Sequence, residues 1–161
     1  MEQNNFDIKK IKVHRTAEGT ILEVVFAIVA IVVWGIIIWL VHQAPDIVPT
    51  HFDASGKPNS FGSPVGSTIP CIILTIGAIS MMVLAYFPRH INMPFKITNI
   101  RQVKLAIRQL RIGGIIFMLV PLAVSYMMLG MKSPSPTPLL VTIGLLLFEI
   151  IIFTILIYKA K

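Results

Sequence analysis

The side chains best suited to chemistry lie in one short segment. His51 and Asp53 are two residues apart, and His42 and Asp46 lie nearby. Imidazole and carboxylate groups together can hold Zn²⁺. In an irregular segment this spacing is a weak indication of metal, so a hydrogen-bonded structural role for His51 is favoured. The sequence has no Gly-rich phosphate loop, nucleophile elbow or His-Glu-x-x-His motif. We therefore expect no catalytic residue, no metal and no cofactor.

One further carboxylate lies inside an apolar run. Glu149 is flanked by Phe148 and Ile150, where a bare charge in a bilayer would cost at least about 3 kcal/mol. Glu149 and Ser80 are at similar depths from the ends of their apolar runs, so we expect a hydrogen bond between them. The carboxylate is either a polar clamp between helices or part of a proton or cation pathway. The sequence favours neither role over the other.

Four long apolar stretches surround these residues. Charged residues make up only 13% of the 161-residue chain, and its mean hydropathy is +0.82. Each stretch reaches the roughly 20 residues needed to cross a hydrocarbon core of about 30 Å. We expect an all-α integral membrane protein, a four-transmembrane-helix bundle forming a single domain over residues 1–161. The predicted helices cover about 20–42, 67–88, 112–131 and 138–158.

Local signals predict details of these helices. Thr20 and Glu23 form a Thr-x-x-Glu pattern, which predicts a capping box at the start of the first helix. Pro121 lies inside the third helix and predicts a kink there. Cys71 is the only cysteine, which excludes an internal disulfide, and we expect it to be an inert packing residue.

Positive charges are distributed unevenly along the chain. Of the 14 Lys and Arg residues, all but Lys57 and Lys132 precede the first helix, lie between the second and third, or follow the fourth. The positive-inside rule therefore predicts that both termini and the basic loop 89–111 are cytoplasmic, and that the motif loop 43–66 faces outward. The predicted location is the cytoplasmic (inner) membrane, which the chain crosses several times. A net charge of +7 indicates contact with anionic lipid headgroups, and no nucleic-acid partner is expected.

The basic loop itself has a helical pattern. From Ile100 to Arg111, apolar residues recur at helical spacing and basic residues fall on the opposite face. We expect a cytoplasmic amphipathic helix that lies on the inner leaflet and runs into the third span at Gly113 and Gly114. The favoured role is a lipid-facing anchor, and the alternative is a docking surface for a cytoplasmic regulator.

The outer loop is the most specific part of the sequence. Asp53 to Gly56 is typical of a turn in which the Asp side chain caps backbone amides and Gly takes a positive φ. Phe52 and Phe61 are expected to tuck the loop onto the helix ends. So much conformational restriction favours a small folded cap over a plain linker.

A family resemblance rests on this loop. The residues Pro49-Thr50-His51-Phe52, Gly56, Pro58 and Phe61-Gly62-Ser63, placed after a first membrane helix, resemble domain-of-unknown-function family 1648. That domain occurs in bacterial membrane proteins related to the Sdp immunity proteins, and the resemblance covers about residues 28–80. Pro64 stands where the family often has a basic residue. The resemblance implies protection against a secreted antimicrobial peptide, with signalling to a transcriptional repressor.

Two functions of different classes are predicted. The first is a non-enzymatic immunity or sensor protein that recognises an extracytoplasmic peptide or envelope ligand through loop 45–63. Its expected ligand-binding residues are Pro49, Thr50, His51, Phe52, Asp53, Gly56 and Phe61. The second is a small proton-coupled transporter, or a transporter subunit, that uses Glu149. An enzyme built on His42, His51 and Asp53 ranks third, and a bundle this small is compatible with a homodimer.

Overall fold

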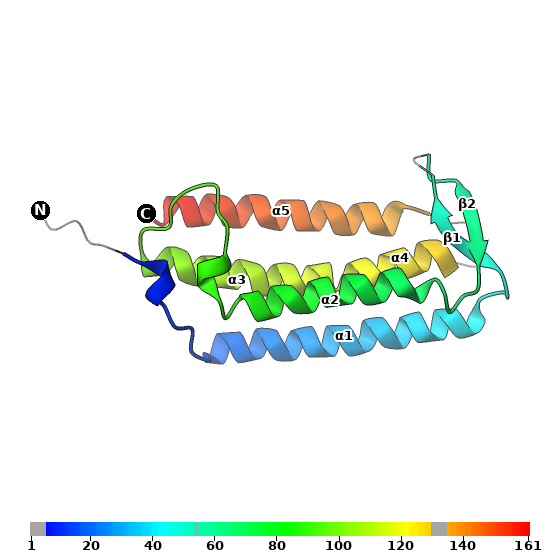
Figure 1. Ribbon diagram of the computed structural model, residues 1–161, viewed down its shortest axis with the longest axis horizontal. Helices are drawn as coiled ribbons and strands as arrows, with labels where there is room; N and C mark the ends of the chain where they lie inside the picture. Colours follow the sequence, from blue (N-terminus) through cyan, green and yellow to red (C-terminus); the bar gives the residue numbers. More distant parts are fainter. Residues whose placement is uncertain (1–5, 54, 130–134) are drawn as a thin grey trace, which may run out of the picture.

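The computed structural model describes residues 6–53, 55–129 and 135–161, which form a helical bundle with a small β-hairpin (Figure 1). In these ranges the main helices are α1 (Ala17–Gln43), α2 (Thr68–Leu84), α3 (Ile100–Phe117), α4 (Leu119–Leu129) and α5 (Thr137–Lys159). The strands are β1 (Val48–Phe52) and β2 (Pro58–Gly62), and short 3-10 helices cover Ile8–Lys10 and Pro88–His90.

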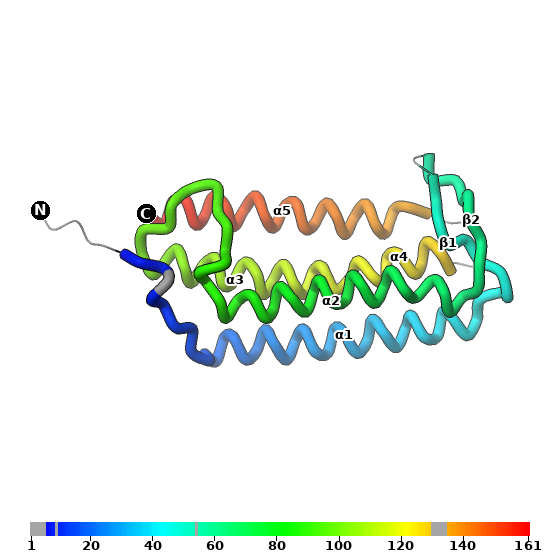
Figure 2. Tube along the Cα trace, viewed as in Figure 1, coloured from blue at the N-terminus to red at the C-terminus, as the bar shows by residue number. Residues whose placement is uncertain are grey.

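The helices run side by side along the long axis of the molecule (Figures 1 and 2). The hairpin lies at one end, and the described N-terminal segment, the C-terminus and the segment between α2 and α3 lie at the other (Figure 1). By length and composition, α1, the run Ile100–Leu129 and α5 are each able to cross a membrane. Helix α2 is apolar but has only 17 residues. Because large apolar side chains such as Ile31, Leu140 and Phe148 are exposed, the surface is that of a helical membrane protein.

The expectation of an all-α fold is wrong in one place. The loop predicted over 43–66 contains β1 and β2, which pair antiparallel as a two-stranded sheet. The strands have five residues each, and they are interrupted by prolines and glycines. Strands this short give too little alternation to be distinguished from a loop.

The amphipathic segment runs into the third apolar run at Gly113 and Gly114, as expected, but part of its apolar face packs inside the bundle and does not lie on a lipid surface. Helix α3 begins at Ile100 and continues without a break through Gly113 and Gly114 to Phe117. Val103 and Ala106 are buried, and Gln102 Nε2 donates a hydrogen bond to the carbonyl of Ile157 in α5 (3.0 Å). Neighbouring helices, and not a lipid surface, thus cover this part of the apolar face.

The first helix begins earlier than predicted. Thr16 is the N-cap, and its hydroxyl accepts a hydrogen bond from the Gly19 N–H (3.0 Å). Thr20 therefore lies inside α1, and the predicted Thr20–Glu23 capping box is wrong. The helix therefore has about one more turn at its N-terminus than the sequence predicted.

The predicted interruption near Pro121 is confirmed. Helix α3 ends at Phe117 and α4 starts at Leu119, with Met118 between them outside both helices. Proline has no N–H to donate to the carbonyl four residues earlier, and its ring clashes with that carbonyl. For Pro121 that carbonyl belongs to Phe117, which accounts for the position of the break.

The centre of the bundle is an apolar cluster that joins α1, α2 and the α3–α4 junction. Its buried members are Val33, Ile37, Cys71, Ala78 and Met118. The Cys71 side chain is fully buried, with its sulfur 3.1 Å from Ser125 Oγ. This position fits the packing role expected for Cys71.

Candidate functional site

The turn of the hairpin is held by one carboxylate. Asp53 Oδ1 accepts hydrogen bonds from the Ser55 N–H (2.8 Å), the Ser55 hydroxyl (2.7 Å) and the Lys57 N–H (3.0 Å). The hydrogen bond from the Ser55 hydroxyl is the main reason that the pKa of Asp53 lies below its ordinary value. Gly56 has a φ of 78°, a conformation that other L-residues adopt at a cost. The predicted turn, with Asp as cap and Gly at positive φ, is confirmed.

The two strands pair with irregular register. Pro49 is opposite Phe61 and His51 is opposite Ser60, so Thr50 has no partner position on β2. Asn59 is the corresponding extra residue on β2, because Phe52 is opposite Pro58. Such bulges increase the local twist and redirect side chains.

The hairpin is fixed to the bundle through β1. Val48 is buried in a cluster with Leu40 of α1 and with Met128 and Leu129 of α4, and Phe52 packs against that cluster. This packing confirms the role expected of Phe52. Phe61 behaves differently: 60% of its surface is exposed, so the expectation that it also tucks onto the helix ends is wrong.

The exposed side chains of the hairpin are polar groups that lie next to one aromatic ring. His51 Nδ1 donates to Asn59 Oδ1 (2.6 Å), and the Thr50 hydroxyl donates to Ser60 Oγ (3.3 Å). His51, Asn59, Ser60 and Phe61 are all exposed. We call this group, with Thr50 at its edge, the hairpin face.

The seven loop residues predicted to bind ligand therefore divide into two groups. Thr50, His51 and Phe61 belong to the hairpin face, and Pro49 is half-buried opposite Phe61. Phe52, Asp53 and Gly56 build and fasten the hairpin. The structure adds Asn59 and Ser60, which sequence reasoning missed. A hairpin closed by Asp53 and Lys57 would have placed them next to His51 and Thr50, to which they are hydrogen-bonded.

The other predicted chemical groups lie apart from the hairpin face. Within the described ranges, no three His, Cys, Asp or Glu side chains are arranged to hold a metal ion. His42 is in the last turn of α1, and Asp46 is exposed in the segment that follows it. Neither side chain is paired with His51, whose hydrogen bond goes to Asn59.

Glu149 faces the bundle, but its expected bond to Ser80 is absent. Only 7% of Glu149 is exposed, and its Oε1 is buried without a hydrogen-bond partner among the described residues. A Cβ on Gly113 would lie 3.5 Å from its Oε2, so the carboxylate sits against the bare backbone of α3. Ser80 is exposed and donates to the carbonyl of Ile76 (2.8 Å). A helical serine bonds back to its own helix in this way when no neighbour is in reach.

A second polar cluster joins α1, α3 and Tyr86 at the end opposite the hairpin, and sequence reasoning missed it. Glu23 accepts a hydrogen bond from the Tyr86 hydroxyl and another from Arg111 Nη2 (3.3 Å), and Arg15 lies 3.8 Å away. The Arg111 side chain is only 5% exposed, and its guanidinium stacks 5.1 Å from the centre of the Tyr86 ring.

The comparisons with known proteins concern the region around the hairpin. Residues 28–75 match the model of a family described as Domain of unknown function (DUF1648). The family resemblance is confirmed over this stretch. The DUF1648 match spans most of α1, both strands and the first part of α2, so it includes the hairpin and leaves out Glu149.

One relative is similar over a limited stretch. It is an uncharacterized protein of Archaeoglobus fulgidus, 37% identical over 70 residues. The similar stretch covers 38% of this chain and 38% of that protein, well short of two thirds of either. No solved structure matches the chain. Because neither the DUF1648 description nor the relative's name assigns an activity, the function has to be argued from the site.

Proposed function

We propose that this chain is a membrane immunity or sensor-type protein that recognises an extracytoplasmic peptide or envelope ligand through its 45–63 hairpin. One observation carries the proposal. The hairpin is closed by the Asp53 hydrogen bonds and packed against α1 and α4, yet its second strand exposes Asn59, Ser60 and Phe61 in succession. A linker between two helices needs neither a fixed shape nor an exposed aromatic ring.

The free edge of the hairpin suggests how a peptide binds. An extended peptide can add a strand to an exposed sheet edge, gaining main-chain hydrogen bonds for affinity and side-chain contacts for specificity. Strand β2 has β1 on one side, and its residues 59–61 are exposed. In this mode Phe61 is the apolar anchor, while His51, held through Nδ1 by Asn59, presents Nε2 to the ligand.

The proposal includes a membrane topology. All four apolar helical segments, α2 among them, cross the cytoplasmic membrane, with the hairpin outside. The described N-terminal segment and the C-terminus lie at the same end of the bundle (Figure 1), as an even number of crossings requires. The basic residues cluster at that end, which the positive-inside rule assigns to the cytoplasm. A cytoplasmic regulator would meet the basic surface there.

Cysteine labelling tests the topology. Cys71 is fully buried, so it gives a low background. A membrane-impermeant maleimide should label Lys57→Cys in intact cells and Lys96→Cys only after lysis. The reverse pattern would overturn the proposed orientation.

Peptide selection tests recognition. A displayed library of extended peptides is panned against the protein in nanodiscs, and the selected peptides are titrated against variants. Phe61→Ala and His51→Ala should weaken binding at least about tenfold, with unchanged thermal stability because both side chains are exposed. Phe52→Ala is the structural control, and it should lower the thermal stability because the half-buried Phe52 ring packs against the cluster of Leu40, Val48, Met128 and Leu129. Peptides that bind Phe61→Ala as well as they bind the unaltered protein would refute the hairpin face as the binding surface.

A second candidate function, proton-coupled transport, is favoured by the environment of Glu149. Glu149 is 7% exposed, and one of its carboxylate oxygens has no hydrogen-bond partner among the described residues. A carboxylate that served only to clamp two helices together would have both oxygens hydrogen-bonded. In proteoliposomes containing a pH-sensitive dye, Glu149→Gln should abolish any proton flux, while Ser80→Ala leaves it unchanged. Full flux through Glu149→Gln would exclude this role.

A further inference from the structure

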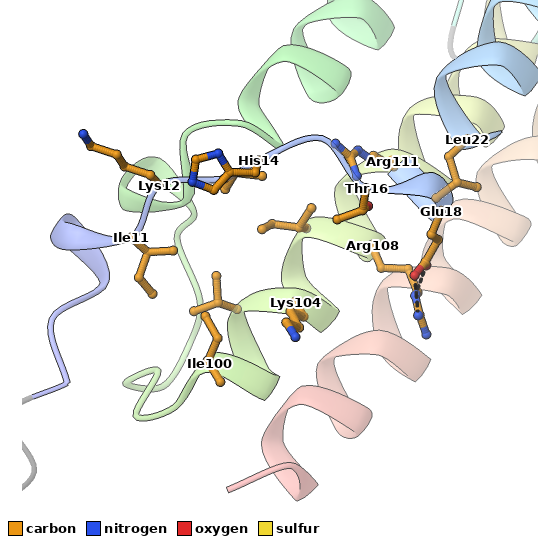
Figure 3. Close-up of a pocket in the computed structure, with 13 residues that line it drawn as sticks. Ile11, Lys12, His14, Thr16, Glu18, Leu22, Ile100, Lys104, Arg108 and Arg111 are labelled. Atoms are coloured by element: carbon orange, nitrogen blue, oxygen red, sulfur yellow. Dashed lines mark hydrogen bonds and ion pairs between the residues drawn. The ribbon is translucent and has the colours of Figure 1, made fainter. Parts of the chain in front are cut away.

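A cavity of about 330 Å³ lies at the end of the bundle opposite the hairpin. The N-terminal segment, the first turns of α1 and the basic part of α3 surround it (Figure 3). Part of its wall is apolar, formed by side chains such as Ile11, Leu22 and Ile107. The rest carries charge, so the cavity is amphiphilic.

The charged part of the wall is strongly basic. Lys12, Lys104, Arg108 and Arg111 line the cavity, against the single carboxylate of Glu18. Glu18 is already held by Arg108 through two hydrogen bonds, one of them 2.8 Å long. Lys12 and Lys104 are exposed and form no ion pair among the described residues. Arg111 is paired with Glu23, which does not line the cavity, so the unneutralised positive charge of the wall is that of Lys12 and Lys104.

Arg111 provides an independent indication of a missing acceptor. The residue is 4% exposed, and its Nε is buried without a hydrogen-bond partner among the described residues. A buried donor without an acceptor is destabilising, so a bound acceptor at this place would be favoured. The guanidinium can lie against the first turn of α1 only because residue 19 is glycine, since a Cβ there would overlap Nη1. The positive end of the α1 dipole adds to the attraction for an anion.

The surroundings of the cavity determine what kind of anion fits. Leu22 lines the cavity, and Val25, one turn further along α1, is exposed together with Ile21 and Ile28. These side chains form the lipid-facing surface of a helix long and apolar enough to cross a membrane. A ligand with its anionic group among the cations and its apolar chains along α1 would satisfy both parts of the wall.

We propose that this cavity binds the phosphate-bearing headgroup of an anionic phospholipid. The headgroup oxygens accept charge-assisted hydrogen bonds from lysine ammonium groups of the wall, and the positive charge of Arg111 adds to the attraction. The first carbons of the acyl chains lie against Leu22 and Ile107. Free phosphate shares the anionic chemistry but makes no use of the apolar wall.

Thermal unfolding of the delipidated protein in an uncharged detergent tests the proposal. Three probes are titrated: dioctanoyl phosphatidylglycerol, dioctanoyl phosphatidylcholine and inorganic phosphate. Only phosphatidylglycerol should raise the unfolding temperature at low concentration. In the Lys12→Gln/Lys104→Gln double variant its apparent affinity should fall at least about tenfold. Without lipid, this variant should unfold at the temperature of the unaltered protein, because both lysines are exposed.

The matched control removes two charges from the same end of the bundle. Arg101 and Lys159 line a neighbouring hollow, which shares Lys104 and Arg108 with the cavity, but neither of the two lines the cavity itself. The Arg101→Gln/Lys159→Gln variant should therefore bind phosphatidylglycerol as the unaltered protein does. An equal loss in both double variants would mean general attraction of anionic lipid to a basic surface, and would overturn a specific site. An equal response to inorganic phosphate would overturn the assignment to a lipid.

Discussion

The two ends of the bundle differ in how far apart along the sequence their hydrogen-bonded residues lie. At the hairpin end, Asp53 bonds to Ser55 and Lys57, and His51 bonds to Asn59 eight residues away. At the opposite end, Glu23 is 63 residues from Tyr86 and 88 from Arg111. The hairpin can therefore assemble its hydrogen bonds from one short segment, whereas the opposite end needs the whole bundle to form first.

The end opposite the hairpin has two ion pairs that differ in exposure to solvent. Glu18 and Glu23 lie on the first turns of α1, and each pairs with an arginine of α3. The Glu18–Arg108 pair is about half exposed, whereas Arg111, paired with Glu23, is almost wholly buried. Exposed ion pairs contribute little because water screens them. We therefore expect the closely contacting Glu18 pair to matter less for stability than the Glu23 pair.

The largest predicted effect is at Glu23. Glu23→Ala removes the acceptor shared by Tyr86 and Arg111 and leaves a buried guanidinium without its counter-charge, which should cost about 3–5 kcal/mol. The matched variant Glu18→Ala breaks an exposed pair and should cost about 0.2–1 kcal/mol. Thermal unfolding of both variants in the same detergent, followed by circular dichroism, measures the difference.

A double variant tests the cause of that loss. Arg111→Met combined with Glu23→Ala removes both charges and should recover part of the stability, since replacing a buried pair by apolar side chains is often neutral. Equal costs for Glu23→Ala and Glu18→Ala would show that burial does not distinguish the two pairs.

An intermediate effect is expected at the hairpin turn. Gly56→Ala places an L-residue in the left-handed backbone conformation (φ 78°), which should destabilise the turn by about 1–2 kcal/mol. Amide exchange of Asp53, whose N–H donates to the carbonyl of Lys57 (2.9 Å), should accelerate about 5- to 30-fold. The unfolding temperature of the bundle should stay the same because the turn's contacts are local. Gly56→Asn, which tolerates this conformation, should exchange more slowly than Gly56→Ala. A fall in the stability of the whole bundle would contradict the local character of the turn's contacts.

The smallest effect is the response of the turn to pH. Hydrogen bonds, first of all from the Ser55 hydroxyl, hold the pKa of Asp53 below its ordinary value. The carboxylate therefore stabilises the turn at any pH above the unfolded-state pKa of about 3.9, and this stabilisation is lost as pH falls through the lower folded-state pKa. The amide resonances of Ser55 and Lys57, followed by NMR in micelles, should shift only below the usual Asp range. Asp53→Asn should remove this response, and a titration at or above pH 4 would disprove the depressed pKa.

The same difference in range explains which features could be predicted. The turn at Asp53–Gly56 and the break near Pro121 follow from residues within a few positions of each other, and both were correctly expected. The Glu23 capping box was wrong because a local pattern was assigned to a residue whose partners are distant in sequence: Tyr86, which follows α2, and Arg111 on α3. Phe52 and Phe61 looked alike in sequence, and only the packing of β1 onto α4 separated a buried ring from an exposed one.

The sequence by itself determined that this chain has long apolar helices, a basic end and a restricted loop that matches DUF1648, because hydropathy, charge and turn chemistry act over short spans of the chain. The tertiary structure alone decided that the amphipathic segment packs within the bundle and that Glu149 faces Gly113 and not Ser80. It also decided that Arg111 is buried beside a basic cavity. Each of these depends on which helix faces become neighbours, and that is fixed only when the helices pack against one another.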